Sequence, residues 1–169
     1  RYRLVGSEMC IRDSAGAASN MILLSDFIIA TPETRFIEVF ARRGLVVDFS
    51  GSWILPRIIG VQKAKELMMT ASEISGTTLN DYGVLYKLVE KPDLDTELDN
   101  LVSLLDKQSF ISICMIKDQI RKGLNTNFDE SLSNETDNQN SRFVHSDVME
   151  GMSAFIEKRQ PEYKNTLDE

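Results

Sequence analysis

A turn of small residues followed by an apolar helix constrains the fold of this chain more than any other feature. Gly16-Ala17-Ala18-Ser19 opens a segment that predicts a short helix over 16–24. The apolar, partly β-branched run DFIIA, at 26–30, predicts a buried strand directly after it. Small side chains at a helix start, with a buried strand close behind, indicate a helix packed closely on a sheet. We therefore expect an α/β fold.

The same turn also has a chemical interpretation. Small side chains let a ligand approach the backbone, and the first N–H groups of a helix lack intrahelical partners. Such donors can stabilise an oxyanion, so the turn is a candidate anion site. Close packing of the helix on its strand explains the same residues without any ligand. The sequence alone leaves both interpretations open.

Further elements follow from local patterns along the rest of the chain. We expect a turn at 31–34, a strand at 35–37 and a helical turn at 40–44 closed by Gly44. Apolar periodicity predicts helices at 50–59, 62–70 and 78–82, and alternation predicts a strand at 84–89. After the composition changes at Lys91-Pro92, four helices are expected at 94–106, 109–122, 128–140 and 146–159.

The organisation predicted from these elements has three parts. Residues 1–14 lack an initiator Met and a clear period, and they resemble a non-native, adapter-like leader. We exclude them from fold reasoning and expect the chain to be an N-terminally truncated fragment. Residues 15–92 would form a partial α/β core, and residues 93–169 a helical C-terminal region.

Composition excludes several classes of function. A net charge of −7 and a pI of about 4.8 make nucleic acid a poor partner. The cysteines, Cys10 and Cys114, have neither zinc spacing nor a disulfide framework, so we expect free thiols in a reducing compartment and no metal. Apolar runs are far shorter than the roughly 20 residues of a membrane span, and no signal peptide pattern opens the chain.

One isolated acid stands out in an apolar, Gly-containing stretch. Asp48, in VVDFSGSW, has no other acid within five residues on either side. Burial among Val, Phe and Trp would raise its pKa and suit it to proton transfer. Alternatively, Asp48 caps the helix that follows. The two roles are compatible, and the sequence does not decide between them.

Other polar and bulky residues have ordinary interpretations. We expect Glu38 to be solvated in a loop. His145 has no partner at ligand or triad spacing, so we expect it to lie at the surface. Trp53 and the Met68-Met69 pair are expected in the core. A solvated helix end is the expectation for Lys158-Arg159.

In combination, the motifs resemble those of the crotonase superfamily, the enoyl-CoA hydratase/isomerase proteins. The small-residue turn, RFIEVFARRGLVVDFSGSWILPRIIG, KAKELMMTASEIS and EGMSAFIEKRQPEYK occur in the family's order. The resemblance covers residues 15–164 and implies the C-terminal part of a ClpP/crotonase spiral of βαβ turns. It also implies an all-helical C-terminal oligomerisation region forming a homotrimer or a dimer of trimers.

The resemblance further implies an activity. Such proteins bind acyl-CoA thioesters, hold the thioester oxygen between two backbone N–H groups, and stabilise an enolate while a carboxylate moves a proton. It implies no cofactor beyond the coenzyme A of the substrate, and no membrane or nucleic-acid partner. The implied location is the cytoplasm, or the mitochondrial matrix or peroxisome in a eukaryote.

Site residues carry over position by position. The Gly16–Ala18 turn matches the turn that supplies one oxyanion donor, with Ala17 N–H as that donor. The family's other donor would lie upstream of this chain. Hydratases that use two glutamates would place them at Asn20 and Phe40, where neither residue can transfer a proton. Asp48 falls where some isomerases of the family carry their acting Asp, and Asn20 could still contact substrate or water.

The remaining matches concern the acyl and coenzyme A groups. Ile37, Phe40 and Val47 would make an apolar acyl pocket, which Phe155 would also line, and Lys158 could approach a CoA phosphate. The resulting hypothesis is an acyl-CoA isomerase or hydratase with Asp48 as its proton carrier. The alternative is a non-catalytic crotonase-like fragment with an oligomerisation or acyl-CoA-binding role.

Overall fold

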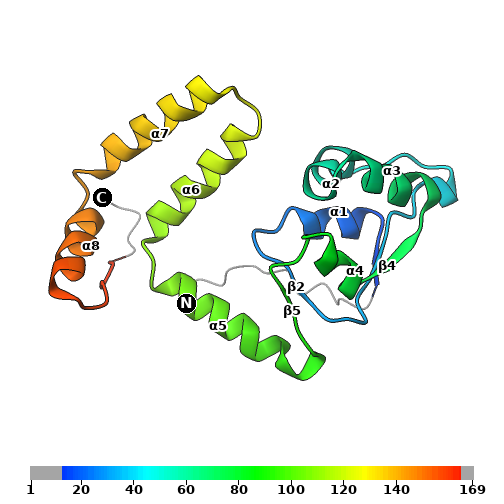
Figure 1. Ribbon diagram of the computed structural model, residues 1–169, viewed down its shortest axis with the longest axis horizontal. Coiled ribbons are helices and arrows are strands. Elements are labelled where there is room, and N and C mark those ends of the chain that lie inside the picture. Colours follow the sequence, from blue (N-terminus) through cyan, green and yellow to red (C-terminus); the bar gives the residue numbers. More distant parts are fainter. Residues whose placement is uncertain (1–12, 165–169) are drawn as a thin grey trace. The chain divides into compact units, whose positions relative to one another are not determined.

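The computed structural model describes residues 13–164, which form two compact units (Figure 1). The first unit ends at Leu98 and the second begins at Asp99, inside helix α5 (Leu94–Asp106). The boundary predicted at 92/93 lies just before this helix. Because each unit is compact by itself, the two are described separately below.

Short strands in the first unit form two small sheets. One has the order β1-β3-β4, formed by β1 (Asp13–Ala15), β3 (Arg35–Ile37) and β4 (Glu73–Ser75). β3 pairs in parallel with β1 and antiparallel with β4. The other sheet pairs β2 (Ile29–Ala30) in parallel with β5 (Lys87–Leu88). Parallel pairing across intervening helices makes this unit an α/β structure.

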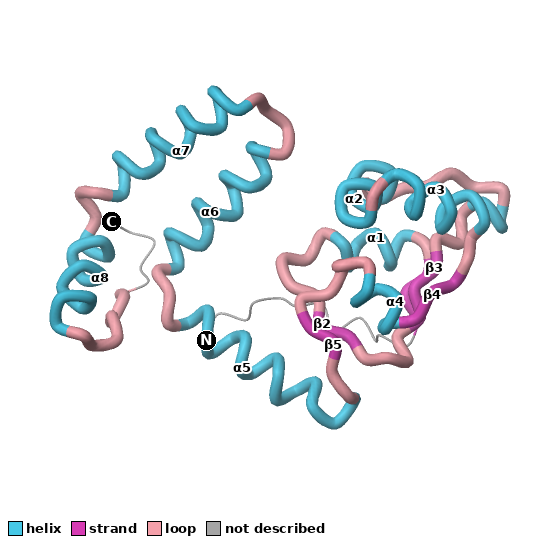
Figure 2. The backbone as a smooth tube through the Cα atoms, in the orientation of Figure 1, coloured by secondary structure: helices cyan, strands magenta, loops and turns pink. Residues whose placement is uncertain are grey.

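Helices cover these sheets, as Figures 1 and 2 show. They are α1 (Ala17–Leu23), α2 (Gly51–Ile59), α3 (Val61–Thr70) and α4 (Gly76–Asp81), with 3₁₀ turns η1 (Ala41–Arg43) and η2 (Lys91–Asp93). Their apolar faces meet β3 in a core of Leu23, Phe36, Leu55, Ile59, Ala64, Leu67 and Leu79. Burying one such Leu side chain stabilises the fold by about 2 kcal/mol. This core packs α1 and α2 against β3.

The second unit is helical. It contains the end of α5 followed by α6 (Phe110–Gly123), α7 (Phe128–Arg142) and α8 (Ser146–Glu157). α6 and α7 run side by side and are joined by a short loop (Figure 2). Side chains of Ser109, Asn127 and His145 cap the starts of α6, α7 and α8 by accepting backbone N–H groups. The predicted helices in this region are confirmed within a few residues.

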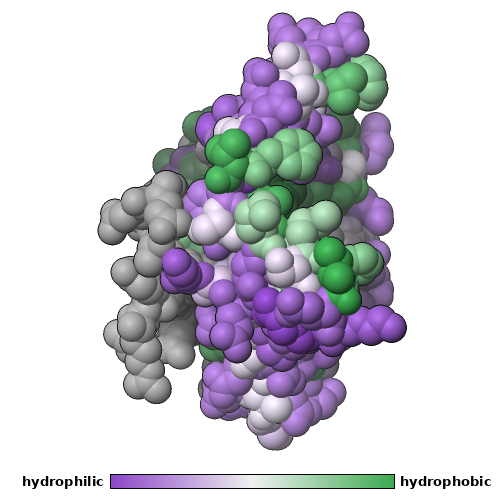
Figure 3. All heavy atoms as spheres, turned by 90° about the vertical axis from the view of Figure 1, so that its left-hand side faces the viewer, coloured by the Kyte–Doolittle hydropathy of each residue, from purple (hydrophilic) through white to green (hydrophobic). Residues whose placement is uncertain are grey.

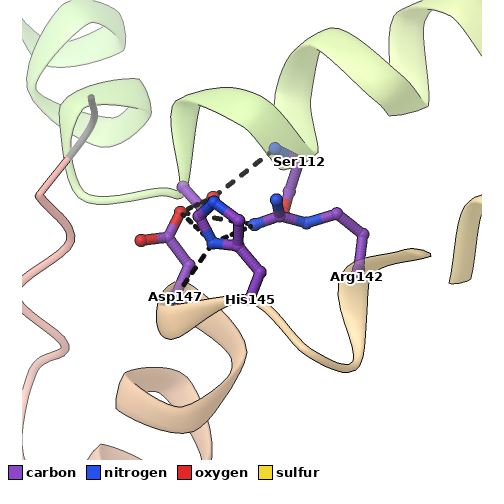
Figure 4. A network of polar contacts seen from close by, with 5 residues as sticks. Ser112, Arg142, His145 and Asp147 are labelled. Atoms are coloured by element: carbon purple, nitrogen blue, oxygen red, sulfur yellow. Dashed lines mark hydrogen bonds and ion pairs between the residues drawn. The ribbon is translucent and has the colours of Figure 1, made fainter. Parts of the chain in front are cut away.

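A buried polar cluster connects the helices of the second unit (Figure 4). Asp147 accepts hydrogen bonds from Ser109 Oγ and, at 3.4 Å, from Arg142 Nη2. His145 Nδ1 lies 3.1 Å from Arg142 Nη2 and accepts the Asp147 N–H at 3.2 Å. The expectation that His145 is a surface residue is therefore wrong, since its side chain is only 12% exposed. The chain turn between α7 and α8 places it inside this cluster.

The structure corrects several boundaries of the predicted elements. The strands expected at 26–30 and 84–89 are each only two residues long. Only β2 (Ile29–Ala30) and β5 (Lys87–Leu88) pair with one another in these segments. The helix expected at 78–82 starts earlier, at Gly76. α8 ends at Glu157, so Lys158 and Arg159 follow the helix, and Lys158 has a positive φ of 55°.

The excluded leader and the expected core also need correction. The last two residues of the excluded segment 1–14, Asp13 and Ser14, belong to β1, so they are part of the described fold. The predicted leader over 1–12, including Cys10, lies outside the described residues. Met69 is 74% exposed rather than buried, and Trp53 is only half-buried under Arg57.

Candidate functional site

The turn before α1 requires glycine. Gly16 has a positive φ of 60°, and its N–H donates to the Ile37 carbonyl at 2.9 Å. A Cβ at this position would lie 3.1 Å from Val39 Cγ1 and 3.5 Å from Phe40 Cζ. No side chain caps the helix start that follows. The turn therefore combines close packing with backbone donors at Ala17 and Ala18, so the two sequence interpretations are compatible.

Asn20 connects α1 to the loop before α2. Its side chain is fully buried, and Nδ2 donates to the carbonyl oxygen of Asp48 at 3.0 Å and to Glu38 Oε2 at 3.4 Å. Gly51 makes this approach possible, since a Cβ there would lie 2.3 Å from Asn20 Nδ2. Asn20 Oδ1 is buried without a hydrogen-bond partner. The amide thus holds the 48–51 backbone against α1.

Glu38 differs most from expectation. Its side chain is 0% exposed, although it was expected to be solvated, and Oε1 is buried without a partner. Burial raises the pKa of the Glu38 carboxyl to about 7; the Asn20 hydrogen bond lowers it in part, and the charge of Asp48 raises it further. An ionisable group poised near neutrality in a candidate site can exchange protons at physiological pH.

A signal for this burial was present in the sequence. Side chains two residues apart on a strand lie on the same face. Phe36, in β3, is 2% exposed and belongs to the core. Glu38 directly follows β3 and shares the register of Phe36. The predicted strand at 35–37 could therefore have indicated a buried acid at position 38.

Asp48 is exposed, so the expected burial among apolar neighbours is wrong. The helix-cap alternative is wrong as well, because the N-cap position of α2 is Ser50 and no side chain accepts a bond there. The Asp48 carbonyl instead accepts two hydrogen bonds, from Gly51 N–H at 2.9 Å and from Asn20. Its carboxylate extends from a backbone that is fixed on two sides.

The loop after Asp48 has a conformation uncommon for side-chain-bearing residues. Phe49 and Ser50 have positive φ values of 45° and 61°. Such left-handed residues without glycine cost about 1 kcal/mol each and recur at functional sites. The Asn20 hydrogen bond helps to hold this strained segment, so the exposed acid lies at the start of a constrained turn.

The predicted apolar pocket residues are only partly brought together. Phe40 is 5% exposed and packs beside Gly16, and Ile37 contacts the same turn through its carbonyl. Val47 is partly buried in the adjacent loop. Phe155, 82% exposed, and Lys158 belong to the second unit. Their part in an acyl-CoA site stays a prediction.

Two searches over residues 13–164 bear on other kinds of site. Those residues contain no group of three or more His, Cys, Asp or Glu side chains that could hold a metal ion. Across the same range, none of the helices combines the length and apolar character needed to span a membrane.

Comparison with known proteins shows the family of this chain. Residues 13–166 match the family model of the enoyl-CoA hydratase/isomerase family, and the chain belongs to this family. The trans-2-decenoyl-[acyl-carrier-protein] isomerase of Streptococcus mutans is 34% identical over 88% of this chain and 57% of its own length. The 1,2-epoxyphenylacetyl-CoA isomerase of Escherichia coli is 29% identical over 89% of this chain and 57% of its own length.

Solved structures show the same fold. An enoyl-CoA hydratase from Bacillus anthracis matches with a TM-score of 0.87 at 27% identity, over 90% of this chain and 59% of that one. An enoyl-CoA hydratase from Polaromonas matches with a TM-score of 0.84 at 30% identity, over 89% and 59%. The fold is thus crotonase-like. The chain spans a little under three fifths of the length of these relatives and structures.

Proposed function

We propose that this chain carries the proton-transfer part of an acyl-thioester isomerase or hydratase that works through a stabilised enolate. The observation that carries the proposal is the hydrogen bond from buried Asn20 to the Asp48 backbone. This bond ties an exposed carboxylate to the helix whose first turn supplies backbone donors. A proton carrier and an oxyanion donor on one rigid support are what enolate chemistry requires.

Isomerisation fits the residues better than hydration. By their names, the two isomerases above act on trans-2-decenoyl-[acyl-carrier-protein] and on 1,2-epoxyphenylacetyl-CoA. A crotonyl-CoA hydratase of Syntrophomonas wolfei is 28% identical, so the choice between the two reactions rests on the site residues and not on identity. Where the resemblance places the two glutamates of hydratases, this chain has Asn20 and Phe40. Neither side chain can activate water by taking a proton. A single exposed carboxylate suffices to move a proton between two carbons.

In the proposed reaction, the thioester oxygen accepts a hydrogen bond from Ala17 N–H. The Asp48 carboxylate removes a proton from a carbon of the acyl chain, and the C–H electrons move into the conjugated enolate. Asp48 then returns the proton to a different carbon, which shifts the double bond and restores the carboxylate. Gly16 and Ala18 leave room for the thioester, and Ile37, Phe40 and Val47 contact the acyl chain. No cofactor beyond the substrate's carrier is involved.

The larger assembly belongs to the same proposal. We expect the chain to complete part of a spiral of βαβ turns and to form a homotrimer or a dimer of trimers through its helical unit, in the cytoplasm. Apolar side chains exposed on α8 support an interface there. They are Met149, Met152, Phe155 and Ile156, at 65%, 60%, 82% and 76% exposure.

Turnover of unsaturated acyl thioesters tests the proposal. The protein and its Asp48→Asn variant are assayed for double-bond migration on acyl-CoA and on acyl carrier protein thioesters. We expect the variant to lose about 10²–10⁴-fold in kcat, the usual contribution of a general acid–base group. Asp81→Asn, at an exposed carboxylate of α4, is the matched control and should retain activity.

Two outcomes would overturn the assignment. Equal turnover by the Asp48→Asn variant would remove Asp48 from the mechanism. Thioester binding without any turnover by the unmodified protein would instead favour the non-catalytic alternative, in which the chain contributes only binding or oligomerisation.

A further inference from the structure

We propose that Glu38 is a positioning residue of this site: its carboxyl, held in the protonated form, fixes the Asn20 amide and through it the loop that carries Asp48. The inference rests on the proposed function only for the role of Asp48. Its structural content, a buried acid that controls a loop, stands on the contacts of the described residues alone.

The geometry places Glu38 behind Asn20 and away from solvent. The Glu38 side chain is 0% exposed, and so is that of Asn20. Asn20 Nδ2 connects Glu38 to the loop, because it donates to Glu38 Oε2 at 3.4 Å and to the Asp48 carbonyl at 3.0 Å. Any change at Glu38 therefore reaches Asp48 through one shared amide. Because Glu38 is covered, it acts through Asn20 rather than by touching substrate.

Two buried oxygen atoms without hydrogen-bond partners support a protonated Glu38 carboxyl. Glu38 Oε1 and Asn20 Oδ1 are both buried and without a partner. A carboxylate would leave two acceptors facing an amide that can offer donors from only one atom. A protonated carboxyl supplies an O–H donor, for which Asn20 Oδ1 is an acceptor with unused capacity. Protonation therefore adds a donor beside two buried oxygens that lack one, whereas the ionised carboxyl adds none.

Charges around Glu38 favour the same state. The charged group that acts on it from the neighbouring loop is Asp48, an anion, and the neighbour from α1 is the neutral Asn20. Burial with an anion nearby disfavours a second negative charge. When Glu38 ionises, the repulsion between the Glu38 and Asp48 carboxylates acts to release the Asp48 loop.

The fluorescence of Trp53 measures the position of this loop without any assay of activity. Trp53 is the one tryptophan of the chain and lies in the first turn of α2, directly after the loop. Titrating the full chain between about pH 5.5 and 8.5, we expect a shift of Trp53 emission with a midpoint near 7, the pKa of Glu38. Glu38→Gln should remove the shift, because its neutral amide cannot ionise.

A matched control and a second probe keep the test decisive. Glu33→Gln, at an exposed carboxylate in the turn before β3, should titrate like the unmodified protein. If Glu38→Gln fails to fold, infrared spectra of the unmodified protein still follow the C=O band of a protonated carboxyl. That band should disappear with the same midpoint. Its absence at pH 6, or a Trp53 shift that persists in folded Glu38→Gln, would overturn the inference.

Kinetics separate this inference from the proposed function. The unmodified protein should lose kcat between pH 6 and 8, as Glu38 ionises and the Asp48 loop is released. Glu38→Gln should keep kcat within about threefold at pH 6 and should show no such fall, with KM little changed. A folded variant inactive at every pH would make Glu38 a catalytic group and would overturn the positioning role. A normal Trp53 titration in a protein without turnover would leave the positioning role standing while the proposed function fails.

Discussion

Glu38 shows how one residue links the stability of this fold to pH. Its pKa is raised from 4.5 to about 7 by burial, so between these values the folded state holds a proton that the unfolded state has released. Stability therefore falls as pH rises through this window and is constant above it. A shift of this size corresponds to up to about 3 kcal/mol, at 1.36 kcal/mol per unit.

The Glu38→Gln variant tests this linkage. It should lack the loss of stability between about pH 4.5 and 7.5, so its advantage over the unmodified protein should grow across that range by up to about 3 kcal/mol. Urea unfolding at several pH values measures the difference. Glu33→Gln, altered at an exposed position, should follow the unmodified protein. Parallel pH curves for Glu38→Gln and the unmodified protein would contradict the burial of a protonated acid.

Two individual residues also show the limit of prediction from sequence. Asp48 was conspicuous because it stands alone among apolar residues, yet it is exposed, since its loop turns outward at Phe49 and Ser50. Glu38 looked like a loop residue, yet the register of β3 carries it into the core. Local composition does not determine which way a loop residue points. The direction depends on contacts between residues far apart in the sequence, such as the hydrogen bond from Asn20 to the Asp48 carbonyl.

At the scale of elements, helices were predicted better than strands. α5 spans 94–106 as expected, because its apolar residues repeat at helical spacing. β1 and β4 were missed, and β2 and β5 are shorter than expected. A strand of two or three residues exists only through its partners, here across long sequence separations. Its β-branched residues alone do not locate it.

The polar cluster between α7 and α8 holds the helical unit together by contacts that the sequence did not indicate. Arg142 and Asp147 are 9% and 6% exposed, and Ser109 joins them from the start of α6 (Figure 4). Removing one member of a buried, hydrogen-bonded pair leaves its partner without compensation. The cluster therefore contributes more than an exposed ion pair such as Arg35 with Glu73.

Asp147→Ala is the variant that tests this cluster. We expect it to destabilise the helical unit by about 3 kcal/mol, because the buried Arg142 guanidinium loses its carboxylate. Thermal unfolding followed by circular dichroism measures the loss. Asp137→Ala, at an exposed position of α7, should change stability by less than about 0.5 kcal/mol. Equal stability of Asp147→Ala and Asp137→Ala would show that the cluster does not stabilise the helical unit by this amount.

On the scale of the whole molecule, exposed apolar side chains indicate association. Figure 3 shows hydrophobic residues on the surface of the face it views. On α8, Met152 and Ile156 are 60% and 76% exposed and one turn apart. Apolar side chains gathered in this way mark interaction surfaces. The predicted assembly into trimers would cover such a face.

Light scattering after size-exclusion chromatography measures this association. The unmodified protein should elute as a trimer or a multiple of it, and Met152→Asp with Ile156→Asp should shift it towards monomer, because two charges would be buried in the interface. Ser133→Asp, on the polar surface of α7, adds charge elsewhere and should leave the assembly intact. A monomeric unmodified protein would contradict the predicted trimer.

The central claim is that Asp48 moves a proton through an enolate, and hydrogen exchange tests it most directly. An unsaturated acyl thioester is incubated with the protein in deuterated water, and deuterium at the carbons beside the double bond is followed by nuclear magnetic resonance. Because Asp48 is exposed, the proton that it takes exchanges with the deuterated solvent before one is returned to the substrate. We therefore predict incorporation together with double-bond migration in the unmodified protein, and a loss of about 10²-fold or more in Asp48→Asn. Migration without dependence on Asp48, or incorporation at the same rate in both proteins, would contradict it.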